Sequence, residues 1–114
     1  DRSVAVSDSM CASGLGDGEY ELGGTTVYVK DGKALLADGT IAASTTNIFA
    51  EFRNIISFGV PVRQAVKSCT INPARAIGVD GVTGSIAVGK RADFTVLSSD
   101  LKELECVYIK GKRI

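Results

Sequence analysis

Ser3-Val4-Ala5-Val6-Ser7 stands near the start of the chain and decides what kind of fold the chain can form. This short run of β-branched and small residues, bounded by polar ones, predicts a β-strand. The segments after it predict a loop, a hairpin and helices, so the strand has no parallel neighbour in this sequence. Because parallel strands need such neighbours, we expect a sheet whose other strands precede Asp1. The start at Asp1, without a methionine, also favours a fragment.

The next part of the chain predicts a β-hairpin. A loop rich in glycine and small polar residues runs from Asp8 to Gly18 and leads into a short strand at Glu19–Leu22. The dipeptide Asp31-Gly32 then supplies the positive φ angles that a type I′ turn requires. It joins the two longer strands of the hairpin, Thr25–Lys30 and Lys33–Ala37.

Three helices and a final run of strands follow. Apolar residues at helical spacing predict the first helix, with Thr45 or Thr46 as its cap and Gly59 near its end. Its apolar stripe consists of Ile48, Phe49, Phe52, Ile55 and Ile56. The other two helices are predicted at about Val62–Cys69 and at Asn72–Gly78, with Asn72 as a cap. The later strands are expected at Ser85–Val88, Asp93–Leu97, Glu103–Lys110 and after Gly111.

Composition excludes several classes of function. The 13 basic residues balance 13 acidic ones, so neither nucleic acid nor a membrane surface is an expected partner. No apolar run approaches the ~20 residues of a membrane span. The chain has no histidine, which removes the commonest metal ligand and the commonest general base. The cysteines form no CxxC pair and are expected to be reduced, buried thiols of a cytoplasmic protein: Cys11, Cys69 and Cys106.

Motifs spread over the whole chain carry a resemblance to a known family. They are Val4–Met10, Gly14–Tyr20, Leu22–Gly24, Asp38–Ser44, Asn72–Ala76 and Gly84–Phe94. Together they resemble the C-terminal part of the bacterial N-acetylglucosamine-6-phosphate deacetylases. The last two motifs are similar to those of many metal-dependent amidohydrolases, whereas the Ser-Asp-Ser-Met loop and the Gly-Glu-Tyr hairpin are typical of the sugar deacetylases.

The resemblance implies an α/β fold, namely the C-terminal piece of a (β/α)8 TIM barrel with part of a small β-sandwich. Ser3–Ser7 would be the eighth barrel strand, and the hairpin at about 19–37 would be an insertion before the eighth helix. Residues 1–78 would therefore belong to the barrel, and residues 79–114 would be the C-terminal strands of the sandwich.

Asp8 is the candidate catalytic residue. By itself, an aspartate in a loop of small residues after a strand is usually a turn former or a cap. The resemblance aligns Asp8 with the catalytic aspartate of the family, at the end of the strand where such barrels carry their chemistry. A carboxylate there can take a proton from an attacking water and pass it to the leaving amine.

The resemblance also implies that the substrate, an amino-sugar phosphate, contacts Ile41-Ala42-Ala43-Ser44. Small residues let the backbone approach a ligand closely, and helix N-termini favour anionic groups. The alternative interpretation is a plain helix entry with Ser44 or Thr45 as its cap, and both stay open. The family generally has glycine where Ala43 stands, which bears on the shape of the pocket.

The metal site of the family is expected to lie outside this chain. The family holds a divalent ion, zinc or a similar metal, with a glutamate and two histidines from earlier barrel strands. The groups that bind the phosphate also precede this segment. We therefore expect the 114 residues to be inactive alone. The full-length parent, commonly a homodimer in the family, would hydrolyse N-acetylglucosamine 6-phosphate to glucosamine 6-phosphate and acetate.

Two other interpretations remain. Another metal-dependent amidohydrolase, such as a cyclic amidase or a deaminase, would keep the role of Asp8, but the Gly-Glu-Tyr hairpin argues against it. A non-catalytic α+β interaction module would fold alone as a monomer. A fragment, in contrast, would expose an apolar face and self-associate. That face is expected to include Val4, Val6, Phe49 and Phe52.

Overall fold

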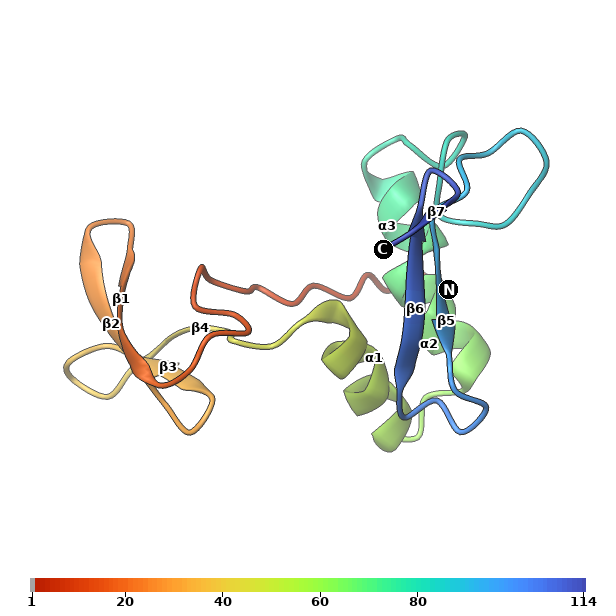
Figure 1. Ribbon diagram of the computed structural model, residues 1–114. Coiled ribbons are helices and arrows are strands. Elements are labelled where there is room, and N and C mark those ends of the chain that lie inside the picture. The colour runs from red at the N-terminus through yellow and green to blue at the C-terminus, as the bar shows by residue number, and fades with distance from the viewer. Residues whose placement is uncertain (1) are drawn as a thin grey trace. The chain divides into compact units, whose positions relative to one another are not determined.

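The computed structural model describes residues 2–114 and shows an α/β chain with two antiparallel sheets and three helices (Figure 1). The chain divides into two compact units. One contains residues 6–51, and the other contains residues 2–5 and 52–114. Each unit has its own sheet.

The unit of residues 6–51 is built on a four-stranded meander, in which each strand pairs only with its neighbours along the chain. Its strands are β1 (Gly18–Leu22), β2 (Thr25–Lys30), β3 (Lys33–Leu35) and β4 (Ile41–Ala43). The predicted turn at Asp31-Gly32 is confirmed, with φ angles of 50° and 71°. β4 was not predicted as a strand, and it pairs with β3 across a register shift.

One face of this sheet carries the core of the unit. Val27 and Val29 alternate with exposed residues along β2, as expected for a strand with one buried face. The side chains of Met10 and Ala12, from the loop before β1, are buried in the same cluster with Ala34. Burial of one such valine contributes about 1.5–3 kcal/mol. The loop that begins with Asp8 is therefore attached to the sheet by its own side chains.

The three helices are α1 (Ile48–Ser57), α2 (Val62–Cys69) and α3 (Ile71–Ala76). The prediction of Thr45 or Thr46 as the cap of α1 is wrong. Asn47 is the cap, because its Oδ1 accepts the backbone N–H of Ala50 at 3.0 Å. The hydroxyl of Thr45 instead donates to the carbonyl of Gly32 at 2.6 Å.

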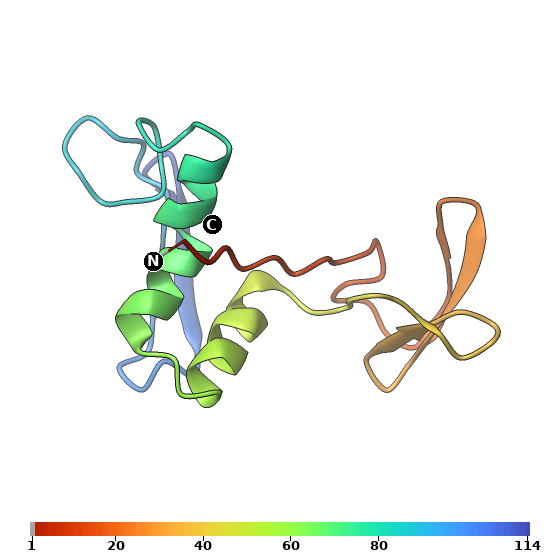
Figure 2. The same ribbon diagram turned by 180° about the vertical axis from the view of Figure 1, so that it is seen from behind.

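Two predictions at the N-terminal segment are also wrong. Ser3–Ser7 is not a strand, because no described strand pairs with it. Residues 3–5 instead lie beside α2 and α3 (Figure 2), where the N–H of Ala5 donates to the carbonyl of Ser68 at 2.9 Å. Asn72 does not cap a helix. It lies inside α3, is buried, and donates from Nδ2 to the carbonyl of Ser3 at 2.8 Å.

The second sheet contains β5 (Phe94–Leu97), β6 (Leu104–Ile109) and β7 (Lys112–Arg113) in antiparallel order. The rings of Phe94 and Tyr108 stack at 4.6 Å across the β5–β6 pair. The strand predicted at Ser85–Val88 is wrong, since these residues form an irregular loop that belongs to no strand. Lys90 holds their loop by donating to the carbonyl of Asp80 and, at 2.7 Å, to the hydroxyl of Ser85.

The cysteines were predicted to be buried and four apolar residues to be exposed, and the structure agrees only in part. All three cysteines are free, but Cys11 is exposed and the other two are only half-buried. Val4 and Val6 are exposed as predicted, whereas Phe52 is buried. No helix of residues 2–114 is long and apolar enough to cross a bilayer. The division at residues 78 and 79 stays a prediction.

Candidate active site

Asp8 begins the loop of the 6–51 unit with an unusual backbone conformation. Its φ is +50°, in the left-handed region, and its side chain is exposed. Aspartate and asparagine tolerate this region better than other residues with a Cβ, so the residue type fits the position. The carbonyl of Asp8 accepts the N–H of Ser44 at 3.0 Å. The carboxylate therefore projects from a backbone that is fixed by a distant part of the chain.

The segment Ile41–Ser44 lies beside the Asp8 loop. Ser9 and Ser44 form a parallel β-bridge, and the N–H of Met10 donates to the carbonyl of Ser44 at 3.0 Å. Two site elements that were predicted separately are thus neighbours in the structure. Their roles in catalysis and in substrate binding stay predictions.

Within this segment the four residues have different surroundings. The side chain of Ile41 is exposed, whereas Ala42 and Ala43 pack against the core of the unit. Neither alanine has a positive φ, so the alanine at position 43 is not strained. The interpretation of the segment as a plain helix entry is wrong, because residues 41–43 form β4 and α1 begins only after Asn47.

A group of hydroxyls in this region was missed by sequence reasoning. Ser9 and Ser13 both donate to the carbonyl of Thr46, the latter at 2.9 Å. The hydroxyls of Ser44 and Thr46 are 2.8 Å apart, and Thr46 Oγ1 donates to the carboxylate of Glu51. The serines and threonines on both sides of β4 were the available signal, but the carbonyls that Ser9 and Ser13 bond are 32 to 37 residues away along the chain. Local patterns do not predict such pairs.

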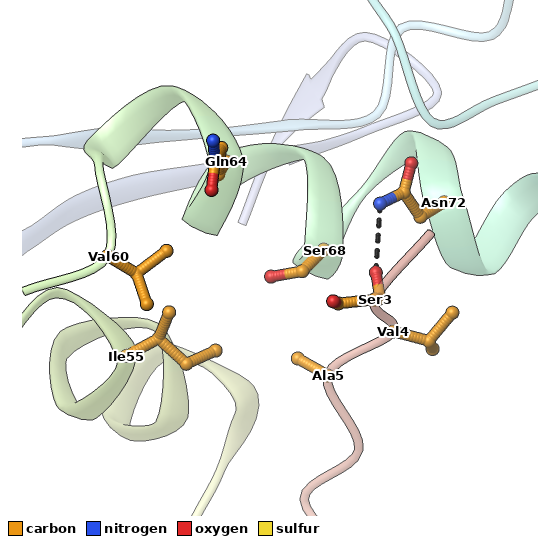
Figure 3. Close-up of a pocket in the computed structure, with 8 residues that line it drawn as sticks. All are labelled: Ser3, Val4, Ala5, Ile55, Val60, Gln64, Ser68 and Asn72. Carbon is orange, nitrogen blue, oxygen red and sulfur yellow. Dashed lines mark hydrogen bonds between the residues drawn. The ribbon is translucent and has the colours of Figure 1, made fainter. Parts of the chain in front are cut away.

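A pocket lies in the unit of residues 2–5 and 52–114, which does not contain the candidate site. It has a volume of about 250 Å³ between residues 3–5 and the three helices (Figure 3). Its lining residues are Ser3, Val4, Ala5, Ile55, Val60, Gln64, Ser68 and Asn72. The buried polar groups of this lining are satisfied, since Asn72 bonds to Ser3 and the hydroxyl of Ser68 donates to Ala65 at 2.8 Å. None of the lining side chains is charged, so we assign no acid–base chemistry to this pocket.

The carboxylates with lowered pKa values also lie outside the candidate site. The backbone N–H of Thr40, 2.9 Å from the Asp38 carboxylate, holds the pKa of Asp38 below its usual range. The N–H of Lys110 lowers the pKa of Asp93 in the same way, at 2.8 Å, with help from Arg91. For Asp100 the pKa is lowered first by the hydroxyl of Ser98. The hydrogen bonds that cause these shifts stabilise turns, and we assign no catalytic role to the three aspartates.

Residues 2–114 contain no cluster of three or more histidine, cysteine, aspartate or glutamate side chains that could hold a metal ion. The sequence contains no histidine. The donor groups of this chain therefore do not fit the divalent ion that the family resemblance implies. The candidate site consists of exposed Asp8 and the segment Ile41–Ser44, which are joined through backbone hydrogen bonds to Ser44.

Comparison with known proteins gives a family and close structural relatives. The sequence pattern of the amidohydrolase family matches residues 26–114. An N-acetylgalactosamine-6-phosphate deacetylase of Escherichia coli O157:H7 is 38% identical over 98% of this chain. The match covers 30% of that protein.

Two solved structures contain a part with nearly the same fold as this chain. N-acetylglucosamine-6-phosphate deacetylase from Pasteurella multocida superposes with a TM-score of 0.91 at 31% identity, over 97% of this chain and 29% of its own. The second structure is an aspartate-to-alanine variant of the N-acetyl-D-glucosamine-6-phosphate deacetylase from Mycobacterium smegmatis, in complex with N-acetyl-D-glucosamine 6-phosphate. It superposes with a TM-score of 0.86 at 35% identity, over 96% of this chain and 30% of its own. The chain thus spans about three tenths of the length of these three relatives.

Proposed function

Because this chain belongs to the amidohydrolase family, we propose that it is part of a deacetylase that hydrolyses the N-acetyl group of N-acetylglucosamine 6-phosphate. The products are glucosamine 6-phosphate and acetate. The likeness to sugar deacetylases extends over nearly the whole chain, which supports this substrate class over a cyclic amidase or a deaminase. Family membership also favours an enzyme over a non-catalytic interaction module.

The observation that carries the proposal is the exposed Asp8, whose backbone carbonyl is bonded to the N–H of Ser44. In the proposed reaction, Asp8 accepts a proton from the water that attacks the acetyl carbonyl carbon. The C–N bond then breaks, and Asp8 returns the proton to the departing amine nitrogen. Since amines leave poorly unless they are protonated, both transfers are needed for turnover.

The segment Ile41-Ala42-Ala43-Ser44 is proposed to contact the substrate. Its small residues allow close approach of the sugar to the backbone. The edge position of β4 supports this role for residues 41–43, because an edge strand keeps backbone groups that no neighbouring strand uses. Both backbone groups of Ser44 are already bonded to the Asp8 loop. The likeness to a structure that contains N-acetyl-D-glucosamine 6-phosphate also supports an amino-sugar phosphate as the substrate.

Other properties of the parent belong to the same proposal. Residues 1–78 would lie in a TIM barrel, with the hairpin at about 19–37 as an insertion, and residues 79–114 in a β-sandwich. A divalent metal would be held by residues outside this chain. The parent is expected to be a cytoplasmic homodimer, and the 114 residues alone are expected to be inactive.

A second substrate deserves direct comparison. The relative from E. coli O157:H7 is named for N-acetylgalactosamine 6-phosphate, which differs from the first substrate only in the configuration at one ring carbon. The proposed role of Asp8 is the same for both sugars. Measuring kcat/KM for the two sugar phosphates with the full-length enzyme decides between them.

The test of the proposal is Asp8→Asn in the full-length enzyme. Asparagine is close in shape and tolerates the left-handed backbone of Asp8, so the loop is kept while the base is lost. We expect kcat to fall by about 10²–10⁴-fold for the better sugar, the range lost with a general acid–base group. Bound metal is measured in both proteins, and it should be unchanged.

Asp100→Asn is the matched control, because Asp100 is an exposed aspartate in the turn between β5 and β6. It should keep the activity of the wild type. Normal turnover of Asp8→Asn would remove Asp8 from the mechanism. A wild-type enzyme that binds metal but releases acetate from neither sugar would refute the proposed substrate class.

A further inference from the structure

We propose that Ser13 is a positioning residue for Asp8, with its hydroxyl fixing the far end of the loop that presents the carboxylate. This inference rests on the proposed function of Asp8. It concerns only residues of the 6–51 unit.

The loop is tied to the β4 region at its first residues. The carbonyl of Asp8 accepts the N–H of Ser44, and the N–H of Met10 donates to the carbonyl of Ser44, each at 3.0 Å. These two bonds fix the backbone on both sides of Ser9. Beyond Met10 the loop is held by the burial of Ala12 and by a hydrogen bond at a second place.

Ser13 supplies that second place. Its Oγ lies 3.0 Å from the carbonyl of Thr45 and 2.9 Å from the carbonyl of Thr46. A hydroxyl has one hydrogen, so the two carbonyls share it in a three-centre bond. The side chain of Ser13 is half-buried, whereas Ser9, which donates to the same carbonyl of Thr46, is exposed. The bond of Ser13 is therefore less open to competition from water.

The residues between the two attachments transmit the constraint. The N–H of Ser13 donates to the carbonyl of Met10 at 3.0 Å, which closes a turn. Within this turn Met10 is 6% exposed and Ala12 is fully buried in the core. Met10 is thus joined to Ser13 by a hydrogen bond and to Asp8 through Ser9. A change in how Ser13 is held changes the angle at which the loop leaves the sheet.

The backbone of Asp8 makes this constraint important. A non-glycine residue in the left-handed region persists only when its surroundings hold it there. If the loop is loosened, Asp8 can relax to a negative φ, and its carboxylate then points in another direction. Because proton transfer requires hydrogen-bond distance between the carboxylate and the water, a displacement of about 1 Å can lower the rate up to 10²-fold.

The experiment uses the full-length enzyme and compares Ser13→Ala with Ser13→Thr, which keeps the hydroxyl. We expect kcat of Ser13→Ala to fall by about 10-fold or more, with KM within about twofold, because the effect is on chemistry and not on substrate affinity. The threonine variant should keep most of the wild-type kcat. Ser57→Ala is the control, since Ser57 donates to the carbonyl of Asn54 at 2.8 Å in α1 and lies in the other unit.

A double-mutant cycle separates positioning from general destabilisation. Ser13→Ala is also introduced into Asp8→Asn, and the residual rate is measured with enzyme in excess over substrate. If Ser13 acts through Asp8, its loss should have little further effect once the carboxylate is gone. An equal loss in both backgrounds, an unchanged kcat of Ser13→Ala, or an equal loss in alanine and threonine variants would overturn the inference. A fully active Asp8→Asn would instead refute the proposed function itself.

Discussion

Backbone conformation at single residues links the sequence to the candidate site. Asp8 and Asp31 both adopt φ values of +50°, but only the second was predictable. Asp31 is followed by Gly32 between two alternating strands, and this pattern requires a type I′ turn. Asp8 is followed by Ser9 and has no such signal. Its conformation depends on the hydrogen bond from Ser44, which lies 36 positions further along the chain.

The clearest stability prediction for a single residue concerns Gly84. Its φ is +84°, and a Cβ added there would lie 2.6 Å from the Cβ of Ala74 and 3.2 Å from the Cα of Ile71. We expect Gly84→Ala to lower the free energy of unfolding by about 2–5 kcal/mol, because backbone strain and overpacking add. Denaturant unfolding of the full-length protein provides the measurement.

Gly78→Ala is the control for the contact. Gly78 has a similar φ of +74°, but a Cβ there meets nothing within 4 Å. Gly78→Ala should lower the free energy of unfolding only by the conformational strain, about 1–2 kcal/mol. Equal losses in both variants would show that the close approach to Ala74 contributes nothing.

Among the elements, the hairpin and the helix α2 were predicted best. β2 and α2 have the predicted bounds, whereas β3 ends at Leu35, two residues before the predicted Ala37. The errors at Ser3–Ser7, β4 and Ser85–Val88 share one physical cause. Whether a short β-prone run becomes a strand depends on a partner elsewhere in the chain, which propensity does not reveal. For the same reason the neighbours of Asp8 could not be read from the sequence.

The start of α1 gives a prediction at the scale of an element. Asn47→Ala removes the side-chain acceptor of the Ala50 N–H, and we expect a loss of about 1 kcal/mol in the free energy of unfolding. Asn54→Ala, in the middle of the same helix, should be neutral or slightly stabilising, because alanine has the highest helix propensity. Thermal unfolding of the two variants compares them. A loss at position 54 as large as that at 47 would argue against capping.

In the molecule as a whole, carboxylates with lowered pKa values occur in both units. Asp38 belongs to residues 6–51, and Asp93 and Asp100 belong to the other unit. For a pKa lowered on folding, the stabilisation is present above the ordinary value of 3.8 and disappears as the pH falls through the folded pKa. Acid conditions should therefore weaken the two units together.

Asp93→Asn tests this pH dependence. An asparagine can still accept the N–H of Lys110 through its Oδ1 but carries no charge to be titrated. We expect the melting temperature of the variant to fall less steeply than that of the wild type between about pH 5 and pH 3. The same change at Asp38 should add to it, since the two residues share no partner. If the melting temperatures of variant and wild type fell in parallel with pH, the charge of Asp93 would not contribute to the acid sensitivity.

The strictly sequential pairing of β1 to β4 has a consequence for the order in which contacts can form. Joining β2 to β3 closes a loop of two residues, whereas the bond from Asn72 to Ser3 closes one of 69 positions. The entropy lost on closing a loop grows with the logarithm of its length, so the sheet is the less costly contact to make first. The bond from Ser44 to Asp8 closes a loop of 36 positions, so we expect it to form after the hairpin of β2 and β3. The candidate base is then expected to reach its place against a surface that is already formed.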